Sequence, residues 1–341
     1  MSATKITLKD IANAAGVSAM TVSKAINNKP GISEKTRQRV LQAAAEAGYV
    51  PNLSAKSLRT NVSRTLGVIL SDSSEMVTSK VLWAIEETCA QHGYSVIIAN
   101  TGHSAQRERE AVQTLFSKQI DGLVLVAPLL YSREDIEQLR RYRKPFVFLM
   151  RKNDQMDVDS VINDNYLGGW QVIEHLVGEG CSRFLFLLIE NSQSCEERKE
   201  GYLRAINAHG IHEEDCRFLY TSPHIEPAKA IMRDFLREEP FSYNALVCGC
   251  DVQAIGAMDA LLEAGKRIPK DVCLAGYDDV ELAQYLRVPL TTVTQPFYEI
   301  GRQGTEILLD RIKYRDMPVR KIVLKSELAV RESSMRRKGR A

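Results

Sequence analysis

The chain has 341 residues, 44% of them hydrophobic and 26% charged, and a formal net charge of +2. No apolar stretch approaches the length of a membrane span and the N-terminus shows no apolar signal region, which excludes a membrane protein and leads us to expect a cytoplasmic one. The charge is unevenly distributed along the chain. Residues 1–65 carry ten basic against three acidic residues, a net +7, and the remainder carries 35 against 40, a net −5. A basic head favours a polyanion as its partner, because neutralising phosphates releases condensed counterions.

The stretch from Thr7 to Asn27 predicts two short helices joined by a tight turn. Thr7 and Asp10 have the spacing of a capping box, and Gly16 follows the first helix where the chain must turn sharply. Ser18 can cap the second helix. Small and apolar residues at the crossing point favour a helix-turn-helix, whose second helix lies in the DNA major groove. The alternative is a pair of helices in an ordinary core, since each signal alone is weak.

A third helix is predicted from Ser33, a candidate N-cap, to Gly48, which would close a three-helix domain over residues 1–48. Residues 49–62 then predict a hinge with a helix of about two turns, which is marginal alone in water and therefore suited to a switch. Within it, Leu58 beside Arg59 is a pair that could wedge and anchor a minor groove. The alternative is an extended linker.

From about residue 63 onward, apolar runs alternate with amphipathic stretches; the runs include TLGVIL, DGLVLVAP and FLFLLIE. Runs without strict alternation predict strands buried on both faces of a parallel sheet, and the stretches between them predict crossover helices. About 270 residues are more than a single hydrophobic core usually accommodates, so we expect an α/β body of two doubly wound halves, each with its own core. Ligands of such sheets bind at the carboxyl ends of the strands.

Three pieces of the sequence resemble those of the lac repressor and galactose repressor family of transcription regulators. They are TLKDIANAAGVSAMTVSKAINN, YVPNLSAKSLRT and body strings such as VCLAGYDDVELAQYLRVPLTTVTQP, and the resemblance covers nearly the whole chain. It implies a periplasmic-binding-protein-like body over residues 63–333. Its N-subdomain is expected at about 63–161 and 291–321, its C-subdomain at about 162–290 and 322–333, and a basic tail at 334–341.

The resemblance also implies DNA contacts. Ala19, Met20 and Lys24 occupy base-reading positions of the second helix; a lysine can donate to guanine, and small apolar groups can pack on a thymine methyl. Positions that usually touch phosphate hold Ser18, Thr21, Ser23, Asn27, Ser33 and Thr36. In the hinge, the leucine that inserts into the minor groove is matched by Leu58, with Asn52, Ala55 and Arg59 beside it.

Arg198, Asp251 and Asp278 match positions that contact effector in the family, and Asp164 with Asn165 fits a DN pair that recurs in it, so these five residues are the expected effector contacts. A guanidinium with carboxylates can clasp vicinal hydroxyls or a sugar acid. Each has a structural alternative: Asp251 could cap a helix, Asp278 could cap a turn and Arg198 could be a surface charge. Residues 76–78, Met-Val-Thr, stand where relatives commonly carry aromatic residues, which disfavours a purine and favours a carbohydrate-like effector.

Other chemistries find little support. The seven cysteines lack the paired spacing of a zinc site and are expected to be reduced thiols, and a metal or redox role for Cys248 and Cys250 is disfavoured. The chain has no nucleophile elbow, P-loop, dinucleotide fingerprint or H-E-x-x-H motif, so we expect no enzymatic activity, no cofactor and no metal. The alternatives are a solute-binding protein of periplasmic type and an enzyme.

These features predict a sequence-specific transcription regulator, most simply a repressor. Its expected partners are a palindromic double-stranded DNA operator, a carbohydrate-like effector in the cleft of the body, and a second copy of the chain, with no membrane. The C-terminus lacks the leucine heptads that could build a further bundle, so a homodimer is expected rather than a tetramer. Induction and corepression by the effector are both thermodynamically allowed.

Overall fold

The computed structural model describes residues 6–49, 62–153, 156–238 and 241–336. The chain divides into two compact units, residues 1–63 and residues 64–341. Each unit has an apolar core of its own.

The first unit consists of three helices, α1 (Leu8–Ala15), α2 (Ala19–Ile26) and α3 (Glu34–Glu46). At the start of α1, the backbone N–H and the hydroxyl of Thr7 both donate to the Asp10 carboxylate, at 2.8 and 2.7 Å. Gly16 ends α1 with a φ of +61°, a left-handed conformation that favours glycine. The core is formed by Ile11, Ala12, Ala15, Val22, Ala25, Val40 and Ala44. The predicted helix, turn and helix are therefore confirmed.

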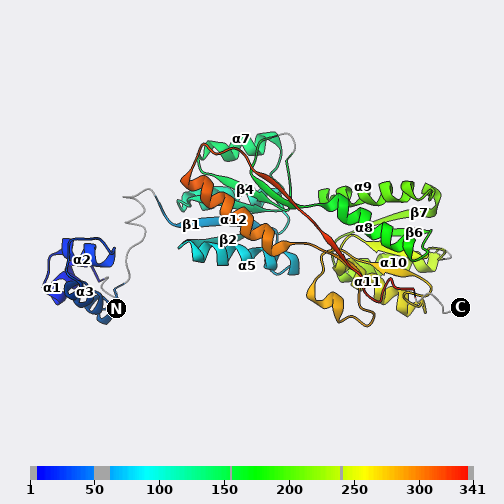
Figure 1. Cartoon of the computed structure of the whole chain (residues 1–341), viewed down its shortest axis with the longest axis horizontal. Helices are drawn as coiled ribbons and strands as arrows, with labels where there is room; N and C mark the ends of the chain where they lie inside the picture. Colours follow the sequence, from blue (N-terminus) through cyan, green and yellow to red (C-terminus); the bar gives the residue numbers. More distant parts are fainter. Residues whose placement is uncertain (1–5, 50–61, 154–155, 239–240, 337–341) are drawn as a thin grey trace. The chain divides into compact units, whose positions relative to one another are not determined.

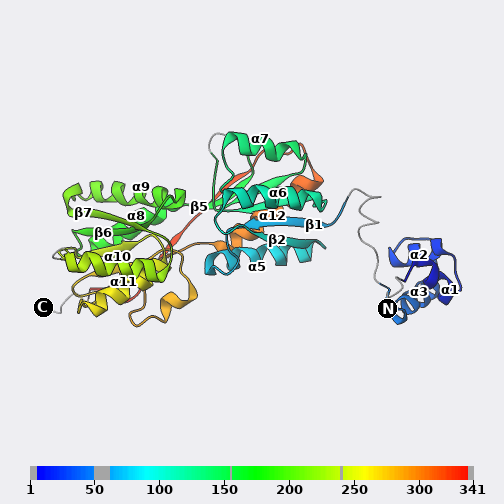
Figure 2. The ribbon, with the colours of Figure 1, turned by 180° about the vertical axis from the view of Figure 1, so that it is seen from behind.

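The second unit begins with a six-stranded parallel sheet in the order β11-β5-β4-β3-β1-β2. Its strands are β1 (Thr65–Leu70), β2 (Ser95–Asn100), β3 (Gly122–Val126), β4 (Phe146–Leu149), β5 (Ser160–Asn163) and β11 (Lys321–Leu324). Helices α5 (Met76–Gln91) and α12 (Phe297–Lys313) cover one face, and α6 (Ala105–Ser117) and α7 (Arg133–Arg141) cover the other (Figure 2).

The other half of this unit is built on a four-stranded parallel sheet in the order β7-β6-β8-β9. Its strands are β6 (Phe184–Ile189), β7 (Cys216–Thr221), β8 (Ala245–Cys248) and β9 (Cys273–Ala275). Helices α8 (Asn165–Gly178) and α9 (Gln193–Ala208) pack on one face, and α10 (Ile225–Glu238) and α11 (Asp251–Glu263) pack on the other. Two short 3-10 helices, η1 (Glu213–Asp215) and η2 (Glu281–Gln284), complete it. The predicted α/β fold class, two doubly wound parallel sheets that follow a three-helix head in the sequence, is confirmed.

Three segments connect the two halves of the body. The chain leaves the first sheet after β5 and returns through β10 (Thr292–Thr294) into α12. It crosses again from β11 to β12 (Glu327–Ala329), which pairs antiparallel with β10 (Figure 1). Since β5 and β11 are themselves neighbours in the first sheet, these crossings lie together at one edge of the fold.

Candidate functional sites

Helix α2 presents an exposed first turn. Ser18 caps the helix and accepts a hydrogen bond from the backbone N–H of Thr21 at 3.2 Å. Ala19 is exposed, Met20 is 71% exposed, and Lys24 is partly exposed one turn further along. A large apolar side chain left in solvent at the start of a helix is a feature of a surface that meets a partner.

Hydroxyl groups collect at the N-terminal ends of two helices of the first unit. The Ser18 and Thr21 hydroxyls lie 3.0 Å apart at the start of α2, and those of Ser33 and Thr36 lie 2.8 Å apart at the start of α3. A helix N-terminus offers backbone N–H groups and positive potential to an anion. Both ends are therefore suited to phosphate oxygens.

Two further residues with a predicted phosphate role, Ser23 and Asn27, lie close together on α2. The Asn27 side-chain amide donates to the Ser23 carbonyl oxygen at 2.8 Å, so this amide N–H is bound within the helix. The hinge residues with predicted DNA contacts, Asn52, Ala55, Leu58 and Arg59, lie outside the described residues.

Arg37 on α3 holds α2 in place, and sequence reasoning missed it. Its guanidinium donates to the carbonyl oxygens of Ala25 at 3.2 Å and Lys29 at 2.9 Å, at the C-terminal end of α2. The Ala25 carbonyl oxygen also accepts from the Asn28 backbone N–H at 3.2 Å, and a cation at this end of α2 complements the helix dipole. The only sequence signal was a basic residue in the first turn of a predicted helix, which points to no particular neighbour.

In the body, α8 and α9 cross closely at two glycines. A Cβ on Gly169 would lie 2.3 Å from the Arg198 carbonyl oxygen, and one on Gly201 would lie 2.2 Å from that of Tyr166. This approach brings the first turns of the two helices together. As a result, Arg198 Nε donates to Asn165 Oδ1 at 3.0 Å.

Arg198 is buried, which excludes the alternative that it is a surface charge. Its Nη1 donates to the Gly249 carbonyl oxygen, its Nη2 lies 3.9 Å from Asp278 Oδ1, and its guanidinium carbon lies 3.6 Å from the centre of the Tyr277 ring. Burial raises the pKa of Asp278 to about 6, against the opposing effects of the Arg198 charge and a hydrogen bond from Gln295. This cluster joins α9 to the two loops that follow β8 and β9, at the carboxyl ends of the second sheet.

Asp251 is completely buried and bonded within the protein. Its Oδ2 accepts from the Val280 backbone N–H at 2.9 Å and its Oδ1 from the Thr292 hydroxyl at 2.6 Å. The alternative that Asp251 caps the following helix is wrong, since Cys250 is the N-cap of α11. Burial raises the pKa of Asp251 well above its ordinary value. Its contacts tie α11 to the segment that leads into β10.

Two glutamines beside this cluster were not identified from the sequence. Gln295 Nε2 donates to Asp278, while the amide oxygens of Gln295 and Gln193 are buried without a hydrogen-bond partner among the described residues. Gln193 also lines a small hollow of about 10 Å³, together with Arg151 after β4. An unpaired buried carbonyl oxygen is costly, and a hydroxyl or N–H donor on a ligand would remove that cost. Gln295 follows a predicted crossing of the chain, which was the available signal.

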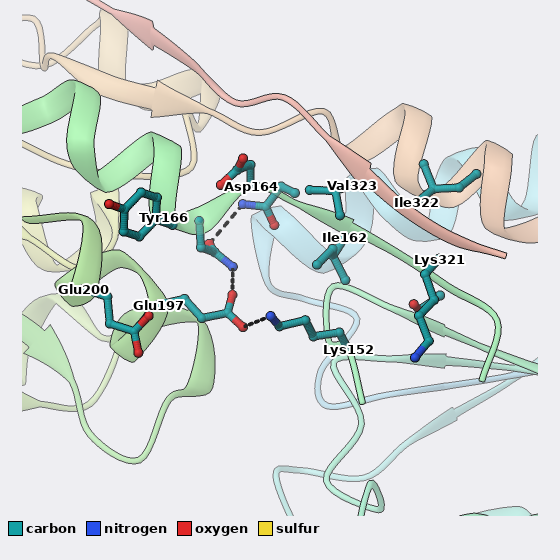
Figure 3. Close-up of a pocket in the computed structure, with 12 residues that line it drawn as sticks. Lys152, Ile162, Asp164, Tyr166, Glu197, Glu200, Lys321, Ile322 and Val323 are labelled. Atoms are coloured by element: carbon teal, nitrogen blue, oxygen red, sulfur yellow. Dashed lines mark hydrogen bonds and ion pairs between the residues drawn. The ribbon is translucent and has the colours of Figure 1, made fainter. Parts of the chain in front are cut away.

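A larger cavity of about 310 Å³ adjoins Asn165 and is drawn in Figure 3. Its walls come from β5, β11 and the start of α8, with Glu197 and Glu200 of α9 and Lys152. Of the five residues with a predicted effector role, Asp164 and Asn165 line this cavity, and Asn165 also contacts Arg198. Arg198 and Asp278 belong to the buried cluster, whereas Asp251 is bonded to Val280 and Thr292. Asp164 caps α8, accepting from the Leu167 backbone N–H at 2.8 Å.

The start of α5 links the two halves of the body. Met76 and Val77, which stand where relatives commonly carry aromatic residues, pack against the core of the second half. Lys80 Nζ donates to the Asp279 carbonyl oxygen at 3.3 Å. These positions therefore serve packing between the halves.

Within the described ranges, no group of three or more His, Cys, Asp or Glu side chains could hold a metal ion. No helix in the same ranges is both long enough and apolar enough to cross a bilayer. All seven cysteines are free thiols, and burial raises the pKa of Cys248 and Cys250. Neither thiol has the lowered pKa that marks a reactive cysteine.

Comparison with known proteins gives two family matches, to "bacterial regulatory proteins, lacI family" at residues 7–52 and to "periplasmic binding protein-like domain" at residues 173–334. The HTH-type transcriptional repressor PurR of Vibrio atlanticus (strain LGP32) is 33% identical over 329 residues, covering 96% of this chain and 98% of that protein.

Solved structures that are similar over nearly the whole chain include the following two. The lac repressor dimer bound to operator and the anti-inducer ONPF matches with a TM-score of 0.88 and 28% identity, covering 97% of this chain and 99% of that one. The complex of the transcriptional regulator CelR with cellobiose matches with a TM-score of 0.71 and 28% identity, covering 96% and 99%.

Proposed function

Since this chain belongs to the lacI family of bacterial regulatory proteins and is a DNA-binding transcriptional repressor of that family, we propose that it binds a palindromic operator as a homodimer under the control of a carbohydrate-like effector. The observation that carries the proposal is the exposed first turn of α2. Ser18 caps this helix, and Val22 and Ala25 anchor it in the core of the first unit, so its outer face is free to enter a major groove. The similar lac repressor was solved as a dimer on operator.

In this proposal Lys24, Ala19 and Met20 read base edges. Lysine donates to guanine O6 and N7, and the two apolar side chains pack on thymine methyl groups. Phosphates are bound by the hydroxyls at the starts of α2 and α3, with Ser23 and Asn27 beside them. Asn52, Ala55, Leu58 and Arg59 act in the minor groove at the operator centre, as the family resemblance implies.

We assign the dimer contact to exposed apolar side chains at the edge of the first sheet. Ile97 and Ile98 are exposed on β2, the outer strand, and Trp83 is 61% exposed on the adjoining helix α5. Exposed apolar groups on an edge strand favour association, and a second copy would bury them around a twofold axis. Sedimentation of wild type and of Ile98→Asp tests this, because a charge at the contact should convert a dimer into a monomer.

The effector is assigned to the cluster of Arg198, Asn165 and Asp278. A guanidinium and a carboxylate beside the unpaired oxygens of Gln193 and Gln295 suit a ligand with several hydroxyl groups. Asp251 acts by holding this cluster in position, and Asp164 by capping the helix that carries Asn165. A relative bound to cellobiose supports a carbohydrate as the class.

Thermal unfolding of the full chain against sugars, sugar phosphates, sugar acids and nucleobases tests the effector assignment. A ligand at one hundred times its Kd stabilises the folded state by about 2.7 kcal/mol. We expect a sugar or sugar derivative to raise the Tm of wild type but not of Asp278→Asn. Asp259→Asn, which changes an exposed carboxylate on α11, is the matched control and should respond as wild type does. An equal response in Asp278→Asn would contradict the assignment.

The stabilising ligand is then added to an operator-binding assay. An effector must bind the two conformations of the repressor with different affinity in order to change operator affinity. A change in operator affinity with wild type, and none with Asp278→Asn, is the expected result. A ligand that stabilises the body and leaves operator affinity unchanged would refute its role as effector.

A further inference from the structure

The 310 Å³ cavity beside β11 has walls of opposite charge (Figure 3). Glu197 and Glu200 lie one turn apart on α9, so both carboxylates line the same side. Lys152, after β4, and Lys321, the first residue of β11, come from the opposite side. We propose that this cavity is a second ligand site, adjacent to the effector cluster and sharing Asn165 with it, and that it binds a small zwitterion with an apolar body, such as a free apolar amino acid.

Glu200 and Lys321 are the exposed charged groups on the two sides of the cavity, while Asp164, which also lines it, caps α8. Lys152 Nζ lies 3.8 Å from Glu197 Oε1, so these two neutralise each other across the cavity, while Glu200 is exposed. Lys321 Nζ donates to the Asn153 carbonyl oxygen at 3.3 Å and lies 3.9 Å from the carboxylate of Asp157, an exposed group; the exposed pair contributes little to stability, and the ammonium has further N–H groups for a ligand. A ligand ammonium can therefore bind at Glu200 and a ligand carboxylate at Lys321.

The floor between the charged walls is apolar. Ile162 of β5 and Ile322 and Val323 of β11 line it, and Val323 is 57% exposed. Tyr166 stands beside Glu200, where its ring can also contact an ammonium group. Apolar walls with a few polar groups are typical of a small-molecule site, and the volume lies at the lower end of the range for such sites. An apolar side chain between the two charges of the ligand fits this lining.

The cavity is connected to the effector cluster by one chain of polar contacts. Arg198 Nε donates to Asn165 Oδ1 at 3.0 Å, Asn165 Nδ2 donates to Glu197 Oε2 at 2.9 Å, and Glu197 pairs with Lys152. Lys152 belongs to the first half of the body, and the other three belong to the second. A zwitterion that binds beside Glu197 therefore contacts the same network that positions Arg198, which gives the two sites a physical connection.

The test is calorimetric titration of the full chain with L-leucine, L-leucinamide and 4-methylpentanoate. The last two probes each lack one charge of leucine and keep its side chain. Leucine should bind. Each analogue should bind at least about tenfold more weakly than leucine, since each loses one charge-assisted contact. Glu200→Gln and Lys321→Gln should each weaken leucine binding about tenfold by the same reasoning. Glu196→Gln, an exposed neighbour on α9 outside the cavity, should leave it unchanged.

Three results would overturn the proposal. Absence of leucine binding to wild type would contradict the assignment of a ligand site to this cavity. Equal binding of all three probes would contradict its selectivity for a zwitterion. Loss of leucine binding in Asp278→Asn, with full binding in Glu200→Gln, would locate the ligand at the effector cluster instead. Because Glu200 and Lys321 are not buried, their glutamine variants are expected to fold, and their Tm confirms this.

Discussion

Replacing Arg198 by alanine should weaken the body and abolish the effector response. The guanidinium is buried, donates to Asn165 and Gly249 and lies 3.9 Å from Asp278. Removing one partner of a buried ion pair costs about 3–5 kcal/mol, because the other charge is left uncompensated. The pKa of Asp278 is already about 6, so the carboxyl can take up a proton and limit the cost. We expect a loss of about 3 kcal/mol, seen as a fall in Tm of about 6 °C or more.

Urea denaturation and ligand-induced thermal shifts measure these two effects. Adding Asp278→Asn to Arg198→Ala should recover part of the lost stability, since the uncompensated carboxylate is then gone. Arg204→Ala, which changes an exposed arginine on the same helix, is the matched control and should leave both properties unchanged. Wild-type stability together with a retained effector response in Arg198→Ala would refute the role given to this residue.

The remaining predictions concern the DNA-binding head and pH. Lys24→Ala should relax base preference at one operator position by about 1–3 kcal/mol, and an unchanged preference in a binding-site selection would remove Lys24 from the reading residues. Leu58→Ala should weaken operator binding far more than non-specific binding in a mobility-shift assay, and equal losses would argue against a wedge. Arg37→Ala should destabilise the head by about 1–3 kcal/mol and weaken operator and non-specific binding alike, and an altered base preference would contradict its positioning role. Burial raises the pKa of Asp278 to about 6 from its ordinary 3.8, so the folded form binds the proton more tightly and the stabilisation present below pH 3.8 is lost as pH rises through about 6. Urea denaturation across this range should show a larger loss in wild type than in Asp278→Asn, in which buried Asp251 still contributes, and identical pH profiles would contradict it.

Local signals predicted the head and the central strands because they reflect short-range physics. The capping pair Thr7 and Asp10 and the turn at Gly16 act within a few residues, and the strand TLGVIL is buried on both faces as an apolar run should be. By contrast, β7 reads CRFLYT and β5 reads SVIN, and neither was identified as an apolar run. The first is an edge strand with partial exposure, and the second is short and polar at both ends, so their pairing depends on distant partners.

The ligand cluster was only partly predictable for a similar reason. The resemblance pointed to Arg198 and Asp278, but no periodicity shows that Gly169 and Gly201 bring α8 and α9 close enough to join Arg198 to Asn165. Asp251 has its oxygens bonded to Val280 and Thr292, contacts made across the fold that sequence spacing cannot show. Residues whose role is to orient other residues therefore appear only in three dimensions.

The central claim is that two copies of this chain read a symmetric DNA site. The most direct test is selection from random double-stranded DNA by the full chain, followed by sequencing of the bound fraction. We predict an enriched motif of two inverted half-sites, because a twofold dimer presents its recognition helices symmetrically. Absence of enrichment, or enrichment of a single half-site without symmetry, would contradict the account.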